Sequence, residues 1–500
     1  MNENNFPILV GVSQYIQRKE ATTRLDPLTL MIKTGRNAIE STHRPKIKDF
    51  IDAIFMVNIN SWSYEDAPAL LAKHLHITPK EKVYLSDGGN TPQMLINRAA
   101  KDIYEHKLRA VLVIGAEAAY SRLLARKGVV ELDWPKREPP AYMEGEIWDG
   151  VNDFENKYKF KFPTHTYALF ETAVRAASNR SIEGHRIYVG ELFQHFSEIA
   201  AKNPYAWSQK SYNAEEITTP TLENRKICYP YTKRMCSNMF VDQSAAILMT
   251  SESLAKNIEI SKENWVYLMG CADLKNVHEI TQRPELYASP ACRVGAQIAL
   301  KQAGLDLKDI SAFDLYSCFP SIVEIMMNEI GIPESYSRDL TITGGLPYFG
   351  GPWSNYSLHA IASTVERIHE KPQSKIMVVA NGGYNSKQSF GIYGAQPPSI
   401  IFSEINSSEV QNKILNDKLK PPVIKASGTF TIEAYTVIYN RDQMPIEAIV
   451  IGKVNPNQRS LAFIRDTPKK LAEILKENLV EKTVKVNYKR NLQCNIIDFD

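Results

Sequence analysis

Short apolar runs alternate with helical patterns over most of this chain, and this alternation restricts the fold more than any other feature of the sequence. Helical patterns separate many of the runs, as at residues 92–107 and 361–370. The expected strands are residues 7–12, 52–59, 82–86, 110–116, 245–251, 265–272, 312–318, 375–383 and 399–405. Strands that alternate with helices predict an α/β fold with mostly parallel sheets.

The expected strands form two series that resemble each other. The runs AVLVIGAEAAY (110–120) and KIMVVANGGY (375–384) are both β-rich and both end in small residues. This similarity indicates a weak internal duplication.

The pattern changes near residue 396. Two Pro-Pro pairs flank a helical pattern, so residues 396–421 are expected to be a linker. Beyond it, apolar and polar residues alternate with period two, and turn signals occur at 440–443 and 455–458. Residues 422–500 are therefore predicted to form a small antiparallel β domain, and a small barrel is one candidate form of it.

The net charge and the cysteine content indicate the cellular compartment and argue against some classes of binding partner. The formal net charge of +3 gives no strong attraction to nucleic acid or to an anionic membrane. Six cysteines without a CxxC pair argue against a zinc knuckle and a disulfide framework, so we expect a cytoplasmic setting and no metal site. No apolar run approaches the length of a membrane span, and the N-terminus does not resemble a signal peptide.

Residues 482–490 interleave basic side chains with one tyrosine, a pattern that single-strand binders use. The charge is modest, and acidic residues precede the run. We therefore expect the β domain to dock on the α/β core, and we do not expect it to bind nucleic acid.

Four glycine- and asparagine-rich turns carry the chemical information. The chain has no GxSxG elbow, Walker loop, GxGxxG or HExxH motif. The four turns are residues 86–93, 314–321, 343–355 and 379–394, each after an expected strand or before a helix. Ligands of α/β folds bind where strand ends give way to loops, so the turns are predicted to line one pocket.

The turns resemble those of thiolases. The spacing of Gly344-Gly345 and Gly350-Gly351-Pro352 is similar to the thiolase loop that reads GG, four residues, GHP. DLYSCFPS (314–321) resembles the segment that reads NEAF in thiolases and HDCF in sterol-carrier-protein thiolases. Residues 229–246 and 391–398 are similar to thiolase-like proteins of type one, often labelled acetyl-CoA acetyltransferase, which carry an additional C-terminal β domain.

The resemblance implies a thiolase fold of two similar mixed-sheet halves, followed by the β domain. The halves would be residues 1–257, with a loop region at about 117–235, and residues 262–395. It also implies an acyltransferase that acts on CoA thioesters in lipid metabolism, with CoA or acyl-CoA as substrate or ligand and no permanently bound cofactor. Thiolases usually pair, so a homodimer is compatible with the resemblance.

The thiolase residues themselves are replaced. The nucleophilic cysteine would lie near residues 88–90, where this chain has Gly88, Gly89 and Asn90. The GHP histidine falls on Gly351, and the late cysteine falls on Ala380. The NEAF pair falls on Tyr316 and Ser317. The usual nucleophile, acid and base are absent there, so standard thiolysis is not expected.

Two functions stay open. The first is an acyltransferase of unusual mechanism, with Cys318, His359 and Asn90 as candidate catalytic residues. The second is a non-catalytic acyl-CoA-binding or scaffold protein. The candidate substrate-binding residues are Gly88, Gly89, Thr91, Tyr316, Ser317, Gly350, Gly351, Asn381, Gly382 and Gly383, and the candidate CoA-phosphate ligands are Lys233 and Arg234.

Each candidate also has a structural interpretation. Cys318 can be a small buried cysteine, and His359 a helix-packing contact. Asn90 and Thr91 can cap the helix that follows or present its amides to a thioester oxygen. The Asn381 turn can be a plain turn, and the loop of Lys233 and Arg234 can simply be solvated.

Overall fold

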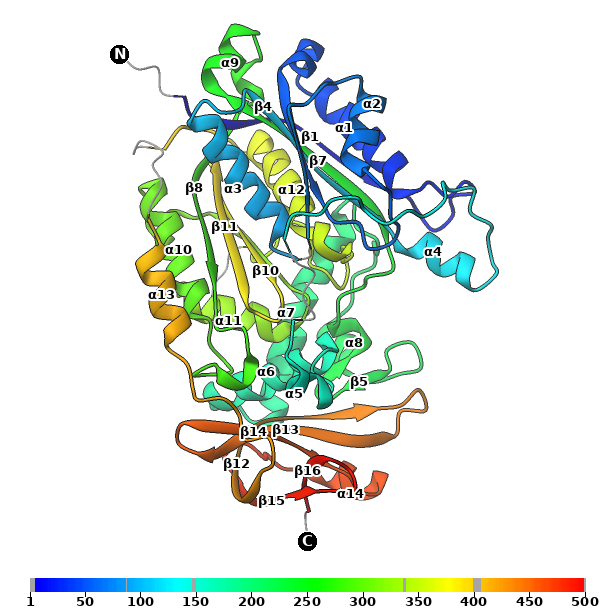
Figure 1. Cartoon of the computed structure of the whole chain (residues 1–500), viewed down its shortest axis with the longest axis vertical. Helices are drawn as coiled ribbons and strands as arrows, with labels where there is room; N and C mark the ends of the chain where they lie inside the picture. Colours follow the sequence, from blue (N-terminus) through cyan, green and yellow to red (C-terminus); the bar gives the residue numbers. More distant parts are fainter. Residues whose placement is uncertain (1–4, 87, 146–149, 336–338, 399–405, 499–500) are drawn as a thin grey trace.

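The computed structural model describes residues 5–86, 88–145, 150–335, 339–398 and 406–498. Within these residues a nine-stranded sheet runs in the order β3-β2-β4-β7-β1-β8-β11-β10-β9 (Figure 1). Its strands are β1 (Pro7–Ile16), β2 (Ile51–Val57), β3 (Glu81–Leu85), β4 (Ala110–Ala118), β7 (Asp242–Ser251), β8 (Val266–Lys275), β9 (Ala312–Leu315), β10 (Lys375–Gly382) and β11 (Lys387–Gly394). The expected strand at 399–405 lies outside the described residues.

The sheet is mixed, so the expectation of mostly parallel strands was wrong. Among the described strands of this sheet, β2–β3, β2–β4 and β9–β10 pair in parallel and the other neighbours pair antiparallel. β7 and β11 run antiparallel to both of their neighbours. β11 was missed because KQSFGIYG contains two glycines and follows a turn, so it was read as part of that turn.

The two halves of the sheet share one strand order, which agrees with an internal duplication. From the centre outward the first half runs β1, β7, β4, β2 and β3, and the second half runs β8, β11, β10 and β9. The second half has no named strand in the place of β3. Residues 339 and 340 lie there instead, because Phe313 N donates to Asp339 O (2.8 Å) and Leu315 N donates to Leu340 O (3.0 Å).

Helices cover both outer faces of the halves and fill the space between them. α3 (Thr91–Tyr104) and α12 (Tyr356–Glu370) pack against each other and against strands of both halves (Figure 1). α1 (Pro27–Glu40) and α2 (Ala67–Leu75) cover the first half, and α10 (Pro290–Ala303) covers β8 and β11. The result is a layered structure with α3 and α12 at its centre.

A long insertion separates β4 from β7. It contributes α4 (Ala119–Arg126), α5 (Asp153–Lys157), α6 (Pro163–Ala177), α7 (Ile182–Lys202), α8 (Ala214–Thr218), β5 (Lys226–Cys228) and β6 (Tyr231–Thr232). α6 packs against α11 (Pro320–Ile330) of the second half and against the C-terminal strands. Two further short helices, α9 (Glu252–Asn257) and α13 (Ser408–Asn416), lie after β7 and in the predicted linker.

The C-terminal strands close into a small barrel. β12 pairs with β13 and β15, β13 with β14, and β16 with β14 and β15, which completes the ring. The strands are β12 (Ser427–Tyr439), β13 (Pro445–Asn455), β14 (Gln458–Ile464), β15 (Thr483–Lys489) and β16 (Cys494–Ile497), with α14 (Pro468–Ile474) between β14 and β15. Pairing is antiparallel except for β14–β16, so the predicted antiparallel β domain is confirmed.

The outer face of β13, β14 and β16 packs on the α/β core. Alternate residues of these strands point into the barrel or join the main core. The Phe463 ring lies 4.8 Å from the ring of Tyr158, which also accepts a hydrogen bond from Asn495 N (2.8 Å). β5 extends the barrel sheet through a bridge from Cys228 to Ile438. The barrel therefore shares an apolar interface with the insertion, and Figure 1 shows the barrel strands next to α5, α6 and β5.

None of the helices in the described part of the chain combines the length and the apolar character that crossing a bilayer requires.

Candidate functional site

The four glycine-rich turns meet at the start of α3. Ser354 Oγ accepts a hydrogen bond from Gly88 N (3.1 Å), and Ser357 Oγ donates to Gly89 O (2.7 Å). Tyr316 N donates to Val379 O (2.9 Å), which joins the second turn to the strand before the fourth. The four turns therefore lie together, but the expectation that all four line one pocket was wrong, because the cavity beside α3 is lined by residues of the first and fourth turns and by none of the second or third.

Glycine is required where the turns touch. A Cβ on Gly89 would overlap the Tyr316 hydroxyl and the carbonyl oxygen of Asn381. Gly344 has a φ of +105°, and a Cβ there would overlap the backbone of Ala200 in α7. Bare backbone at these positions allows the turns to close on one another and on the insertion.

The nearby glycines have similar close neighbours. A Cβ would meet Gln243 at Gly350, Ser237 at Gly351, Asn90 at Gly382 and Ser386 at Gly383. Ser317 is buried, and its Oγ accepts from Leu346 N (3.2 Å) in the third turn. These candidates shape the junction with their backbones.

Asn90 is buried at the start of α3 but does not cap it. Its side chain makes no cap hydrogen bond, and its Nδ2 donates to Ser389 Oγ (3.2 Å). Its Oδ1 has no hydrogen-bond partner among the described residues. A buried acceptor without a donor is costly, and this oxygen lies against Gly88 and Gly382.

Cys318 lies beside a tyrosine in an apolar environment. Its side chain is hydrogen-bonded with Tyr167, whose hydroxyl also accepts from Asn381 Nδ2 (2.9 Å). The Tyr167 ring stacks on Phe319 at 4.8 Å. Burial raises the pKa of the Cys318 thiol to about 12, so it carries its proton at neutral pH. A protonated thiol with 8% exposure is a poor nucleophile.

His359 packs inside the protein. Its Nδ1 lies 2.9 Å from Gln14 Oε1, and its ring lies 5.3 Å from Phe349. Burial lowers the pKa of His359 to about 3, so the imidazole is neutral. Its contact with Gln14 joins α12 to β1, so His359 is a helix-packing contact in this structure.

A cavity of about 490 Å³ opens beside the start of α3. Gln411 of α13 lies at its edge, where it bonds Lys275 N (2.7 Å) and Lys275 O (2.8 Å). The lining residues are Leu85, Ser86, Asn90, Thr91, Met94, Gly145, Asp273, Leu274, Lys275, Asn276, His278, Ser386, Lys387, Gln388, Gln411 and Leu415. Its volume lies within the range of ligand pockets, about 300–1,000 Å³.

The predicted phosphate ligands lie apart from this cavity lining. Lys233 is exposed. Arg234 donates to Glu216 O (2.7 Å), and its guanidinium lies 4.2 Å from the Tyr212 ring. Arg234 therefore holds its own loop together.

Sequence analysis did not identify Lys275 and Lys387, which line the cavity, or Tyr167, which lies beside Cys318. Lys275 and Lys387 lie on adjacent antiparallel strands, paired directly across β8 and β11. Because β11 had been read as a turn, nothing in the sequence brought the two lysines together. Tyr167 lies in the middle of an amphipathic helix, where a core aromatic is the usual interpretation.

Comparisons with known proteins were made for the whole chain. Residues 409–490 match the family described as "Thiolase-like protein type 1 additional C-terminal domain". A solved structure of a monomeric SCP2-thiolase-like protein type 1 from Mycobacterium smegmatis is 30% identical and has a TM-score of 0.85. The match covers 100% of both chains.

More distant relatives share the fold. An acetyl-CoA acetyltransferase of Syntrophomonas wolfei is 14% identical with a TM-score of 0.56, and the match covers 79% of this chain and 100% of that one. An acetyl-CoA acetyltransferase of Methanocaldococcus jannaschii is 20% identical over 306 residues, 61% of this chain and 70% of the relative. The similarity to the solved Syntrophomonas wolfei structure agrees with a thiolase fold.

Proposed function

The chain belongs to the SCP2-thiolase-like proteins of type 1, and we propose that it binds CoA thioesters at the start of α3 without forming an acyl-cysteine. The observation that carries this proposal is Asn90, a buried residue that lines the cavity and has an Oδ1 without a donor. The pantetheine arm of CoA carries two amide N–H groups, which match such an acceptor.

Lys275 and Lys387 are the candidate phosphate ligands of this cavity. Both line it on paired strands, and Lys275 is exposed. His278 lines the same side. Ammonium groups bind phosphate through charge-assisted hydrogen bonds, so this pair replaces Lys233 and Arg234 in the proposal.

The absence of a reactive thiol favours binding over acyl transfer. Gly88, Gly89 and Asn90 offer no sulfur at the start of α3, and the Cys318 thiol holds its proton. Thioester exchange through a cysteine requires the thiolate. We therefore propose an acyl-CoA-binding or scaffold role as the principal function.

Acyl transfer remains the second candidate, favoured by one observation. Two relatives of the same fold are named acetyl-CoA acetyltransferase. In this chain transfer would have to proceed without an acyl-cysteine, with Tyr167 and Asn381 as the polar groups nearest Cys318.

A monomer is proposed in place of the homodimer that the thiolase resemblance allowed. The Mycobacterium smegmatis protein is described as monomeric. All six cysteines are free, which suits a reducing compartment, and the cytoplasmic location stays a prediction.

Calorimetry with CoA and a non-hydrolysable acyl-CoA thioether tests the site. Changing Lys275→Ala together with Lys387→Ala is expected to weaken binding about 10- to 100-fold, because two charge-assisted contacts are lost. Lys233→Ala with Arg234→Ala is the matched control and should leave the affinity unchanged. Weakening by the control pair alone would place the phosphates at the 233–234 loop, and no binding by the unaltered protein would contradict the proposal.

A further inference from the structure

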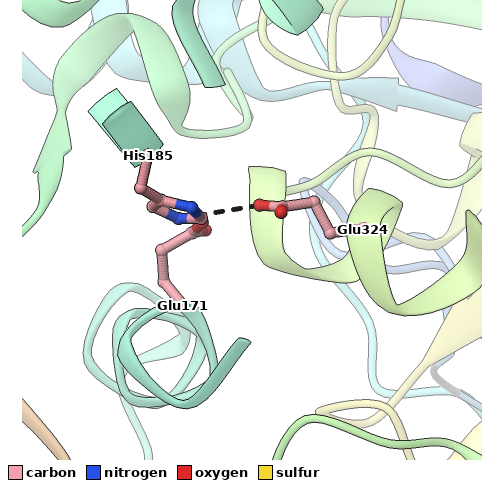
Figure 2. A group of neighbouring side chains, drawn as sticks. All are labelled: Glu171, His185 and Glu324. Carbon is pink, nitrogen blue, oxygen red and sulfur yellow. Dashed lines mark hydrogen bonds and ion pairs between the residues drawn. The ribbon is translucent and has the colours of Figure 1, made fainter. Parts of the chain in front are cut away.

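Three buried ionisable side chains from three helices meet behind the Cys318 turn. Glu171 comes from α6, His185 from α7 and Glu324 from α11 (Figure 2). His185 Nε2 lies 2.6 Å from Glu171 Oε1 and 3.7 Å from Glu324 Oε1. Each side chain is at most 4% exposed. We call these three residues the Glu-His-Glu cluster.

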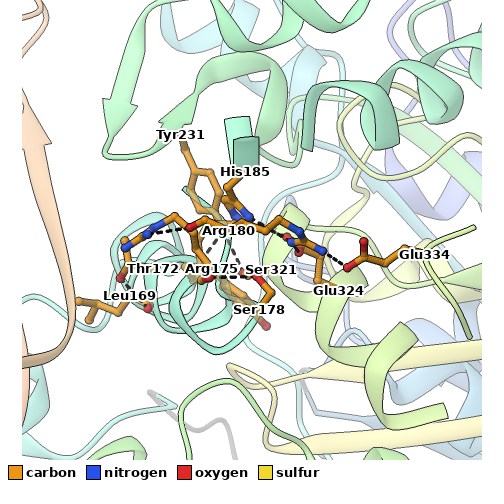
Figure 3. A network of polar contacts seen from close by, with 12 residues as sticks. Leu169, Thr172, Arg175, Ser178, Arg180, His185, Tyr231, Ser321, Glu324 and Glu334 are labelled. Atoms are coloured by element: carbon orange, nitrogen blue, oxygen red, sulfur yellow. Dashed lines mark hydrogen bonds and ion pairs between the residues drawn. The ribbon is translucent and has the colours of Figure 1, made fainter. Parts of the chain in front are cut away.

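The outer oxygen of each carboxyl group in the cluster is held by a separate donor. The Tyr231 hydroxyl donates to Glu171 Oε2 (2.6 Å), and Arg180 donates to Glu324 Oε2 (2.7 Å) (Figure 3). The two Oε1 atoms and the imidazole Nε2 are therefore left facing one another. Glu324 Oε1 has no hydrogen-bond partner among the described residues, although it is buried.

The cluster has fewer positive than negative groups. Among the described residues, Arg180 is the cation bonded to Glu324, and it also pairs with the half-exposed Glu334. Arg175, the next cation on α6, donates to the Arg180 carbonyl (3.1 Å) and to Asn478 (2.5 Å). Tyr188 of α7 faces the Arg180 guanidinium at 3.7 Å. Two buried carboxylates beside one shared guanidinium require a further proton or cation.

Burial and the neighbouring Glu171 raise the pKa of Glu324 to about 8, and burial lowers the pKa of His185. Nδ1 of His185 lies 3.2 Å from Arg180 and accepts from it, so Nε2 carries the hydrogen and donates to Glu171.

We propose that the Glu-His-Glu cluster binds one divalent transition-metal ion, such as Mn²⁺ or Zn²⁺. An imidazole with two carboxylates is a donor set that these ions accept. Ligand bonds of about 2.0–2.2 Å require His185 Nε2 and Glu171 Oε1 to move apart. Coordination through Nε2 requires the imidazole hydrogen on Nδ1, so the contact between Arg180 and Nδ1 is broken while Arg180 keeps its bond to Glu324.

The surroundings leave one side of the ion open. A cavity of about 100 Å³ is lined by Glu171, His185 and Tyr231, together with apolar side chains such as Val189 and Met235. Water or a small oxygen ligand would complete the coordination there. The ion would also tie the insertion to α11, which begins two residues after Cys318.

Metal binding is measured on the full, tag-free chain after removal of ions with EDTA. Mn²⁺ is the first probe, because it prefers oxygen and imidazole ligands to thiols and so avoids the cysteines. We expect one ion per chain by calorimetry and by electron paramagnetic resonance.

Glu324→Gln keeps the shape of the side chain and removes the charge. It is expected to weaken binding at least about 100-fold, and His185→Gln should do the same. Glu334→Gln is the matched control, because Glu334 pairs with the same Arg180 without reaching the cluster, and it should bind normally. Circular dichroism checks that each variant is folded. No Mn²⁺ or Zn²⁺ binding by the unaltered chain, or equal binding by Glu324→Gln and His185→Gln, would overturn the proposal.

Discussion

Arg459→Ala is expected to lower the free energy of unfolding by about 3–5 kcal/mol, as removal of one partner of a buried ion pair usually does. Arg459 is 0% exposed and lies between the barrel and the second half. It donates to both oxygens of Glu433 (2.5 and 2.9 Å) and to the carbonyls of Arg283 and Pro284. The variant leaves these acceptors without a donor and opens a void at the interface. Urea unfolding of the full chain, followed by circular dichroism, measures the change.

Lys453→Ala is the control for this prediction. Lys453 also pairs with Glu433, at 3.4 Å, but its side chain is 35% exposed. Exposed ion pairs contribute about 0–1 kcal/mol, so a small change is expected. If Arg459→Ala destabilised the protein no more than Lys453→Ala does, Arg459 would not anchor the barrel to the core.

Gly89→Ala is expected to lower the free energy of unfolding by about 1–3 kcal/mol, the usual cost of overpacking a well-packed site. The added methyl group would overlap the Tyr316 hydroxyl and the Asn381 carbonyl oxygen, and the latter is backbone. Either the turns move apart or α3 shifts. Chemical denaturation measures stability, and CoA calorimetry on the folded fraction should show weaker binding, because Asn90 follows Gly89 directly.

Gly88→Ala is the neighbouring control. Its methyl group would meet Asn90 Oδ1 and Thr91 Oγ1, which are ends of side chains. Such atoms can shift by rotation, so the cost should stay below about 1 kcal/mol. Equal stability of the two variants would mean that the four turns do not close on Gly89 in the way described.

Local sequence pattern predicted most of the fold. The β1 and β4 segments are buried along nearly their whole length, so they appear as apolar runs. The barrel strands β12 and β13 were predicted from the alternation of apolar and polar residues and from the turn residues that follow each of them. The prediction of mostly parallel strands was wrong, because strand direction depends on how each connection crosses the sheet.

The candidate site was predicted in part. Gly89, Asn90, Tyr316 and Asn381 meet because each lies near the carboxyl end of a strand, where the glycine- and asparagine-rich turns indicated a junction. The Glu-His-Glu cluster could not be found in this way, since its residues lie far apart in the chain on amphipathic helices. Buried carboxylates look like exposed helix residues in sequence, and only packing distinguishes them.

The most direct test of the account is incubation of the purified chain with acetyl-CoA, followed by intact-mass analysis and an assay for free CoA. Residues 88–90 contain no cysteine and burial raises the pKa of the Cys318 thiol to about 12, so we predict bound acetyl-CoA, no covalent adduct and no CoA release above the rate in buffer. Cys318→Ser should behave identically. A stoichiometric acetyl adduct on the unaltered chain that disappears in Cys318→Ser would contradict the account and make Cys318 the nucleophile.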